Sequence, residues 1–159
     1  MATFHSLRVA EVARETSDSV VVSFEVPSEL TEAFSFEAGQ YLTLRTTIDG
    51  EEVRRSYSLC SAPRDGKWQV GIKKVPGGKF STFANDVLDA GIEMDVMDPQ
   101  GRFLLKEGAG LHHLGMAAGS GITPILSQIK QVLSEDPSAT YTLFYLSLIH
   151  ISEPTRRYF

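Results

Sequence analysis

Short runs of alternating hydrophobic and polar residues dominate the first part of the chain, and this two-residue period predicts β-strands. In Tyr41–Ile48, Leu42 and Leu44 alternate with polar neighbours. The pair Asp49–Gly50 follows, and it suits the positive φ angles of a tight hairpin turn. We therefore expect Glu51–Leu59 to return as the partner strand of an antiparallel hairpin.

Other runs in the same part of the chain are also typical of strands. They are Ser19–Val26, Trp68–Val75, in which Trp68, Val70 and Ile72 share one face, and Glu93–Met97. One helix is expected between the last two runs, with Ser81 as its N-cap and Gly91 at its end. About six strands with a single short helix predict an all-β antiparallel six-stranded Greek-key barrel. A β-sandwich is the alternative that strand spacing leaves open.

The pattern changes after the glycine-rich segment Gly108–Gly110, which is expected to be a linker. The following elements are an apolar strand at His113–Ala118, a glycine turn at Gly119–Gly121, a helix at Thr123–Leu133 and a strand at Tyr141–Tyr145. Four residues are expected on the apolar face of that helix: Ile125, Leu126, Ile129 and Val132. The order strand, helix, strand predicts a βαβ unit with parallel strands and a right-handed connection.

One βαβ unit is too small to form a domain by itself, since a sheet covered by helices on both faces needs several such units. The predicted organisation is therefore a barrel, the start of a truncated nucleotide-binding domain, and a tail. These parts cover residues 1–107, 108–146 and 147–159, respectively.

The composition of the 159 residues is that of an ordinary globular protein, with 42% hydrophobic and 22% charged residues. A net charge of −5 argues against nucleic acid as the main partner, because binding a phosphate backbone needs a clustered excess of Lys and Arg. The single cysteine, Cys60, cannot form an internal disulfide or a Cys-only metal or iron–sulfur site. The sequence contains no signal-peptide pattern and no apolar run long enough for a membrane span, so a cytoplasmic location is expected.

The first candidate binding segment is Arg55–Ser58, at the end of the predicted strand Glu51–Leu59. Side chains alternate along a strand, so Arg55 and Tyr57 are expected on one side. A guanidinium can hold a diphosphate with two parallel hydrogen bonds, and a phenol ring can pack on a flat heteroaromatic ring. The alternative is an ordinary edge strand with a solvated Arg and a half-buried Tyr.

A second candidate segment is Gly77–Ser81, directly before the short helix. Glycines let backbone amides converge, and a helix N-terminus favours an anion such as phosphate. Ser81 can cap the helix and donate a hydrogen bond to phosphate, while Lys79 adds positive charge. A plain capped loop is the alternative, and core packing is the alternative role for Phe80.

A third candidate segment is Gly119–Pro124, which follows an apolar strand and opens a helix. In that context a glycine pattern predicts dinucleotide binding. Pro124 stands where the usual fingerprint has a third glycine, and proline suits the first turn of a helix.

Together, the three segments resemble the ferredoxin–NADP reductase-like flavoproteins. In that family an Arg-x-Tyr-Ser motif and then a Gly-x-x-Ser motif mark the flavin barrel, and a Gly-x-Gly-x-x-Pro loop opens the nicotinamide domain. The matching segments here are Arg55–Ser58, Gly78–Ser81 and Gly119–Pro124, in the same order. Ala38–Gln40 is similar to the family's Pro-Gly-Gln turn with Pro replaced by Ala, and Pro99–Phe103 resembles the segment that closes its barrel.

The resemblance implies an enzyme that uses FAD and NAD(P)H. Tyr57 would pack against the isoalloxazine ring and Ser58 would hydrogen-bond to it, so these two residues are the expected catalytic residues. Arg55 would hold the diphosphate. The other residues expected at the flavin are Lys73, Gly78, Lys79, Phe80 and Ser81, and those expected at the pyridine nucleotide are Gly119, Ser120, Gly121, Ile122, Thr123 and Pro124. No metal site is expected, because the adjacent His112 and His113 point to opposite sides of a strand.

Two further segments, Thr3–Leu7 and Gly50–Tyr57, resemble the reductase components of phenylacetyl-CoA epoxygenases. This resemblance implies that a hydride passes from NAD(P)H to FAD and that electrons then pass to an iron–sulfur centre or an acceptor protein, in support of phenylacetyl-CoA epoxidation in aromatic catabolism. Full-length relatives add a 2Fe-2S domain, for which this chain has no ligands. The implied partners are a pyridine nucleotide and an electron-acceptor protein or oxygenase component, and neither nucleic acid nor a membrane is expected. The alternative is a non-catalytic flavin- or nucleotide-binding module.

The sequence after Tyr145 departs from the family, which continues there with a Gly-Asn-Arg-like loop. Residues 147–159 resemble a peptide encoded by sequencing-adapter DNA and are expected to be a non-native tail, with a divergent C-terminus as the alternative. The loop after the second strand usually distinguishes NADH from NADPH, so the sequence gives no nucleotide preference. We expect full-length relatives to be enzymes, and this fragment to bind flavin with poor turnover or none.

Overall fold

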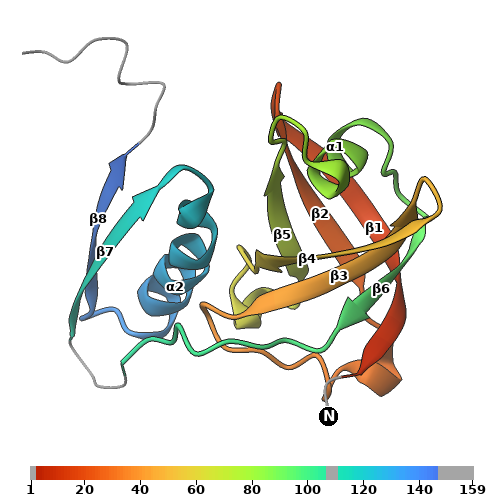
Figure 1. Ribbon diagram of the computed structural model, residues 1–159. Coiled ribbons are helices and arrows are strands. Elements are labelled where there is room, and N and C mark those ends of the chain that lie inside the picture. Colours follow the sequence, from red (N-terminus) through yellow and green to blue (C-terminus); the bar gives the residue numbers. More distant parts are fainter. Residues whose placement is uncertain (1–2, 107–110, 147–159) are drawn as a thin grey trace, which may run out of the picture.

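The computed structural model describes residues 3–106 and 111–146, which form a barrel and a smaller unit beside it. In Figure 1 the long helix of the smaller unit faces the barrel. The elements of the barrel are β1 (Phe4–Thr16), β2 (Ser19–Glu25), β3 (Tyr41–Ile48), β4 (Glu51–Ser58), β5 (Trp68–Lys73), β6 (Glu93–Met97) and the helix α1 (Lys79–Asp86). The elements of the smaller unit are β7 (His112–Ala118), the short helical turn η3 (Gly119–Gly121), α2 (Ile122–Glu135) and β8 (Thr140–Leu146).

Six antiparallel strands form the barrel sheet in the order β4-β3-β6-β1-β2-β5. The two edge strands of this order meet at a bridge between Leu59 and Val70. Next to it, the amide of Cys60 donates a hydrogen bond to the carbonyl of Gln69 over 2.9 Å. The predicted antiparallel barrel is therefore confirmed.

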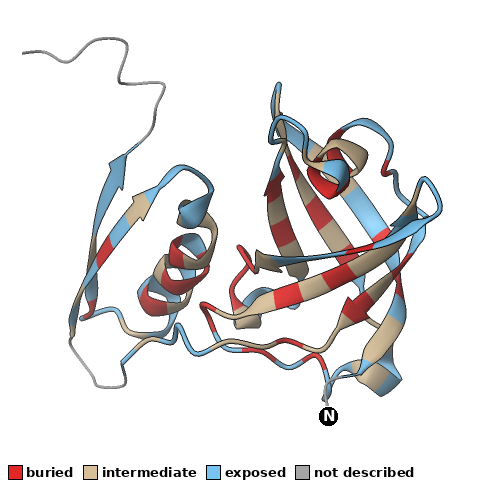
Figure 2. Cartoon of the chain, in the orientation of Figure 1, coloured by how far each residue is buried: buried red, intermediate tan, exposed pale blue. Residues whose placement is uncertain are grey.

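The core of the barrel lies on the inner faces of its strands, where buried and less buried residues alternate (Figure 2). Leu42, Leu44, Val70 and Ile72 have no exposed surface, as the two-residue period predicted. The predicted hairpin turn is also confirmed, since Asp49 and Gly50 have φ angles of 52° and 77°.

Helix α1 differs from the prediction in its start and its end. It begins at Lys79 with Gly78 as its N-cap, and it ends at Asp86. Ser81 is therefore not the N-cap: its hydroxyl lies in the first turn, accepting from the amide of Val75 over 3.2 Å. The earlier start has a packing reason, because it turns the fully buried Phe80 into the core of the barrel.

The smaller unit has the predicted strand, helix, strand order, and β7 and β8 are parallel. The buried face of α2 was only partly predicted. Ile125 and Val132 are buried, but Leu126 is 37% exposed. Two polar side chains, Ser127 and Gln128, are buried in its place.

These polar side chains join α2 to the barrel by hydrogen bonds to backbone carbonyls. Ser127 Oγ donates to the carbonyl of Ser61 over 2.6 Å. Gln128 Nε2 donates to the carbonyl of Phe103 over 2.9 Å. A helix that meets loops rather than an apolar sheet needs such donors, because the carbonyls it covers lose their contact with water.

Within the described ranges, none of the helices has both the length and the apolar character required to cross a membrane. The predicted tail, residues 147–159, and the whole of the predicted linker, Gly108–Gly110, lie outside the described residues.

Two glycines with positive φ angles allow a matched test of one close contact in this fold. A Cβ at Gly39, where φ is 109°, would lie 1.8 Å from the carbonyl oxygen of Phe103, whereas a Cβ at Gly50, where φ is 77°, would meet nothing within 4 Å. We expect Gly50→Ala to lower the free energy of unfolding by about 1–2 kcal/mol through backbone strain alone. Gly39→Ala should lower it by at least about 1–3 kcal/mol more, because the backbone contact must also open. Equal losses in urea denaturation would contradict the close contact.

Candidate functional site

A cleft of about 430 Å³ lies where the barrel meets the first turn of the smaller unit. Strands β4 and β5 and the start of α1 line it from the barrel, and the glycine turn with the start of α2 lines it from the other unit. It brings together most of the residues predicted from the three sequence motifs: Arg55, Tyr57, Ser58, Lys73, Gly78, Phe80, Ser81, Ser120, Gly121, Thr123 and Pro124.

Three predicted residues do not line this cleft. Lys79 pairs with the carboxylate of Glu51 across the barrel surface. The hydrogen bond from Lys79 lowers the pKa of the exposed Glu51 carboxyl. Gly119 and Ile122 line a neighbouring cavity of about 510 Å³, together with the turn between β1 and β2 and the side chain of Tyr145.

Three residues of the cleft were not predicted: Ser56, Gly71 and Val75. Ser56 Oγ shares a hydrogen bond of 2.9 Å with Thr43 Oγ1 on the neighbouring strand. Gly71 carries a sequence signal, because glycine in the interior of a strand often marks close approach of another backbone or a ligand. Val75 follows β5 and has no such signal.

Arg55 supplies a positive charge to the cleft. Its neighbour Arg54 forms an ion pair with Glu52 at 2.6 Å. Arg55 instead donates from Nη1 to the backbone carbonyl of Arg54 over 2.6 Å. Within residues 3–106 and 111–146, no carboxylate lies within ion-pair distance of Arg55. A guanidinium in this situation at a cleft favours an anionic ligand.

Tyr57 forms an aromatic part of the wall. Its ring lies 5.7 Å from the ring of Phe80, centroid to centroid, at an angle of 37°. Phe80 is 1% exposed, so it supports Tyr57 from within the core. Burial raises the pKa of the Tyr57 phenol, and the charge of Arg55 opposes this rise. Tyr57 therefore stays a neutral phenol at physiological pH and offers an uncharged aromatic surface.

The loop before α1 is compact enough to require glycine. A Cβ at Gly78 would lie 2.5 Å from both Ser81 Oγ and the Cγ2 of Val75. The first turn of a helix also has amide N–H groups without partners inside the helix, and they favour an anion. This loop therefore presents backbone donors on the same cleft as Arg55.

The second unit supplies the facing wall of the cleft. The hydroxyl of Thr123 donates to the carbonyl of Ser120 over 3.1 Å and so braces the glycine turn. The phenol of Tyr145 donates to the carbonyl of Gly119 over 3.2 Å from the end of β8. This wall lies at the carboxyl ends of the two parallel strands, where α/β sheets bind their ligands.

Taken together, the lining fits a flat aromatic ring joined to a diphosphate. Arg55 and Lys73 carry positive charge, Tyr57 offers an aromatic surface, and the turn at Gly78 leaves no room for a side chain. Hydroxyl groups complete the lining, and those expected to bind are Ser58, Ser81, Ser120 and Thr123.

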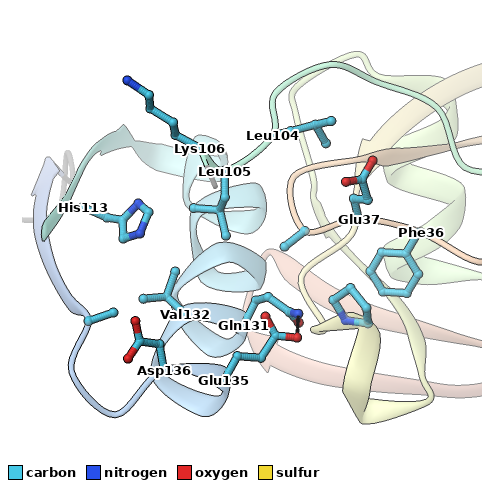
Figure 3. Close-up of a pocket in the computed structure, with 13 residues that line it drawn as sticks. Phe36, Glu37, Leu104, Leu105, Lys106, His113, Gln131, Val132, Glu135 and Asp136 are labelled. Carbon is cyan, nitrogen blue, oxygen red and sulfur yellow. Dashed lines mark hydrogen bonds between the residues drawn. The ribbon is translucent and has the colours of Figure 1, made fainter. Parts of the chain in front are cut away.

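A larger cavity of about 640 Å³ lies elsewhere on the boundary between the two units (Figure 3). It lies between the second half of α2, residues 104–106 and the loop of Phe36 and Glu37. None of the predicted site residues lines it, and it contains the carboxylates of Glu37, Glu135 and Asp136. Such acidic side chains repel a diphosphate, so the smaller cleft is the candidate site despite its size.

Comparison with known proteins identifies the family and the fold of the chain. Residues 6–104 match the oxidoreductase FAD-binding domains, and the chain belongs to this family. The fold is that of the ferredoxin reductase-like flavoproteins: the chain superposes on phthalate dioxygenase reductase with a TM-score of 0.75 and 27% identity, covering 91% of this chain and 44% of that one.

Individual relatives are also similar in sequence. The chain is 45% identical over 147 residues to one of the subunits of 1,2-phenylacetyl-CoA epoxidase from Escherichia coli K12, covering 91% of this chain and 41% of that protein. It is 38% identical over 133 residues to the ferredoxin reductase component of 3-ketosteroid-9-alpha-monooxygenase from Rhodococcus rhodochrous, covering 81% of this chain and 37% of that protein. The chain thus spans less than half the length of these curated relatives.

The two adjacent histidines, at which no metal site was expected, contact hydroxyl groups and an aromatic ring. His112 contacts the hydroxyls of Thr140 and Thr142, and His113 stacks on Tyr141 at 5.8 Å. In the part of the chain that the structure describes, no three His, Cys, Asp or Glu residues group as metal ligands would.

Cys60, two residues after the end of the Arg55–Ser58 segment, is 7% exposed. Burial raises the pKa of its thiol, with the Lys130 charge opposing. The contribution of this thiol to stability is therefore present below its unfolded-state pKa and is lost as the pH rises through its folded-state pKa. We expect iodoacetamide at pH 8 to alkylate the native chain at least about tenfold more slowly than the unfolded chain.

The measurement is unambiguous because Cys60 is the single cysteine of the sequence, so any mass increase from one alkyl group reports it. Equal alkylation rates in buffer and in denaturant would show that the thiol is exposed and would contradict its burial.

Proposed function

We propose that this chain is the flavin-holding part of an NAD(P)H-dependent reductase and that the 430 Å³ cleft is its FAD site. The observation that carries this proposal is the meeting of the Arg55 guanidinium, the aromatic ring of Tyr57 and the compact turn at Gly78 on one cleft. The family to which the chain belongs supports the choice of FAD.

Bound FAD would supply the chemistry of accepting a hydride and releasing electrons singly. The residues of the chain bind and orient it. Arg55 and the amides at the start of α1 hold the diphosphate, Tyr57 packs against the ring, and Ser58 offers a hydroxyl to it. The predicted catalytic roles of Tyr57 and Ser58 are thus orientation and hydrogen bonding rather than strong acid–base chemistry.

The pyridine nucleotide is assigned to Gly119–Pro124, at the carboxyl end of β7. Four residues of this segment, Ser120, Gly121, Thr123 and Pro124, line the same cleft as the flavin residues, so they would hold the nucleotide next to the flavin. This proximity is what a direct hydride transfer requires.

The acceptor is proposed from the relatives. The phenylacetyl-CoA epoxidase protein and the monooxygenase reductase component are named as parts of oxygenase systems. Phthalate dioxygenase reductase is described as transferring electrons from pyridine nucleotides to [2Fe-2S]. We infer that a reductase containing this chain passes electrons to an iron–sulfur centre or an oxygenase component, with phenylacetyl-CoA epoxidation as the supported process.

The adjacent arginines provide a matched test of the flavin site. Arg55→Ala should weaken FAD binding by about 2–4 kcal/mol, because a charge-assisted contact to the diphosphate is lost. Arg54→Ala removes the same charge one residue away, on the opposite side of the strand, and should weaken binding by less than about 0.5 kcal/mol. The measurement is an FAD titration of each variant, followed by flavin absorbance.

If both variants lose affinity equally, the effect is that of overall charge and the cleft is misassigned. If Arg55→Ala binds FAD as tightly as the unmodified chain, Arg55 does not hold the diphosphate. Circular dichroism of both variants serves as the control for folding.

A further inference from the structure

The flavin cleft has two walls that come from different units, and they touch at Gly71. A Cβ at Gly71 would lie 2.8 Å from the Cγ2 methyl of Thr123, closer than real Cβ atoms pack. Gly71 lies in the interior of β5, and its φ is not in the left-handed region. The backbone therefore does not require glycine there, and the close approach of Thr123 does.

The side chain of Thr123 is not free to turn away from β5. Its hydroxyl donates to the carbonyl of Ser120, so rotating the methyl away would break the bond that braces the glycine turn. A larger residue at position 71 must therefore either push the turn outward or break this bond.

Helix α2 cannot retreat easily to make room. The buried bond from Ser127 Oγ to the carbonyl of Ser61 anchors it one turn beyond Thr123. Lys130 Nζ donates to the carbonyl of Cys60 over 3.0 Å, two residues after β4 ends. Any displacement caused at Gly71 is therefore concentrated at the glycine turn, which lines the cleft.

We propose that Gly71 is a positioning residue that sets the width of the flavin cleft by seating Thr123 directly on β5. This inference rests on the proposed FAD site. On one side of the cleft lie Arg55, Tyr57 and Ser58, and on the other lie Ser120, Gly121, Thr123 and Pro124. The Gly71–Thr123 contact is the point at which the distance between these walls is fixed.

The same contact separates the flavin cleft from the neighbouring cavity of about 510 Å³. Both are lined by Gly71, Lys73, Ser120 and Thr123. A change in the contact therefore alters the boundary of both spaces, whereas the diphosphate-binding side of the cleft, around Arg55 and Gly78, is left intact.

The test is a double-mutant cycle of Gly71→Ala, Thr123→Ser and the two combined. Thr123→Ser removes the clashing methyl and keeps the hydroxyl, so it is the matched rescue. We expect Gly71→Ala to weaken FAD binding about tenfold, in the range caused by overpacking, and to change the visible circular dichroism of the bound flavin. Measured against Thr123→Ser alone, the double variant should lose less than about threefold in FAD affinity, so that the cost of Gly71→Ala largely disappears once the methyl is gone.

Unchanged affinity and unchanged visible circular dichroism in Gly71→Ala would overturn the proposal. So would a loss that Thr123→Ser fails to rescue, because the contact would then not be the cause. Where Gly71→Ala alone does not fold, the double variant decides: restored folding and FAD binding support the contact, and continued unfolding overturns it. If the folded unmodified chain binds no FAD, the proposed function itself fails. This is a distinct result, and it overturns the positioning role of Gly71 as well.

Discussion

The edge strands of the six-stranded sheet, β4 and β5, meet through the bridge between Leu59 and Val70 and the amide of Cys60 on the carbonyl of Gln69. These strands are neighbours in space only because the sheet curls until its ends meet. That closure places Arg55–Ser58, at the end of β4, beside the strand that carries Gly71 and leads into α1. Without it, the charge, the aromatic ring and the amide-rich turn would lie on opposite edges of an open sheet.

The second wall of the site depends on a different kind of contact. Helix α2 meets loops of the barrel, and its buried Ser127 and Gln128 donate to the carbonyls of Ser61 and Phe103. Directional bonds of this kind fix orientation, whereas apolar packing alone permits sliding. The other face of the β7–β8 sheet has no such partner among the described residues, and Met116 and Phe144 there are 72% and 60% exposed. The smaller unit is thus bonded to the barrel through α2, and the described residues leave the opposite face of its sheet exposed to solvent.

Local sequence signals predicted much of this structure. The alternation in β3, the Asp49–Gly50 turn and the three motifs depend on short-range chemistry, and the cleft contains residues from all three motifs. What was missed depends on long-range contacts. Burial of Phe80 moves the start of α1, and docking onto carbonyls buries Ser127 where periodicity favours Leu126. Lys79 is directed to Glu51 by a hairpin far away in sequence, and Gly71 acquires its role from Thr123 in the other unit.

A flavin held in the cleft should be reducible by a pyridine nucleotide. The most direct measurement is the absorbance spectrum of the purified chain with FAD, recorded before and after anaerobic addition of NADH and of NADPH. We expect a bound-flavin spectrum that at least one of the two nucleotides bleaches, since a single reduction of the flavin does not require turnover. A bound flavin that neither nucleotide bleaches would contradict hydride transfer in this chain and favour a binding module. A folded chain that takes up no FAD would contradict the site itself.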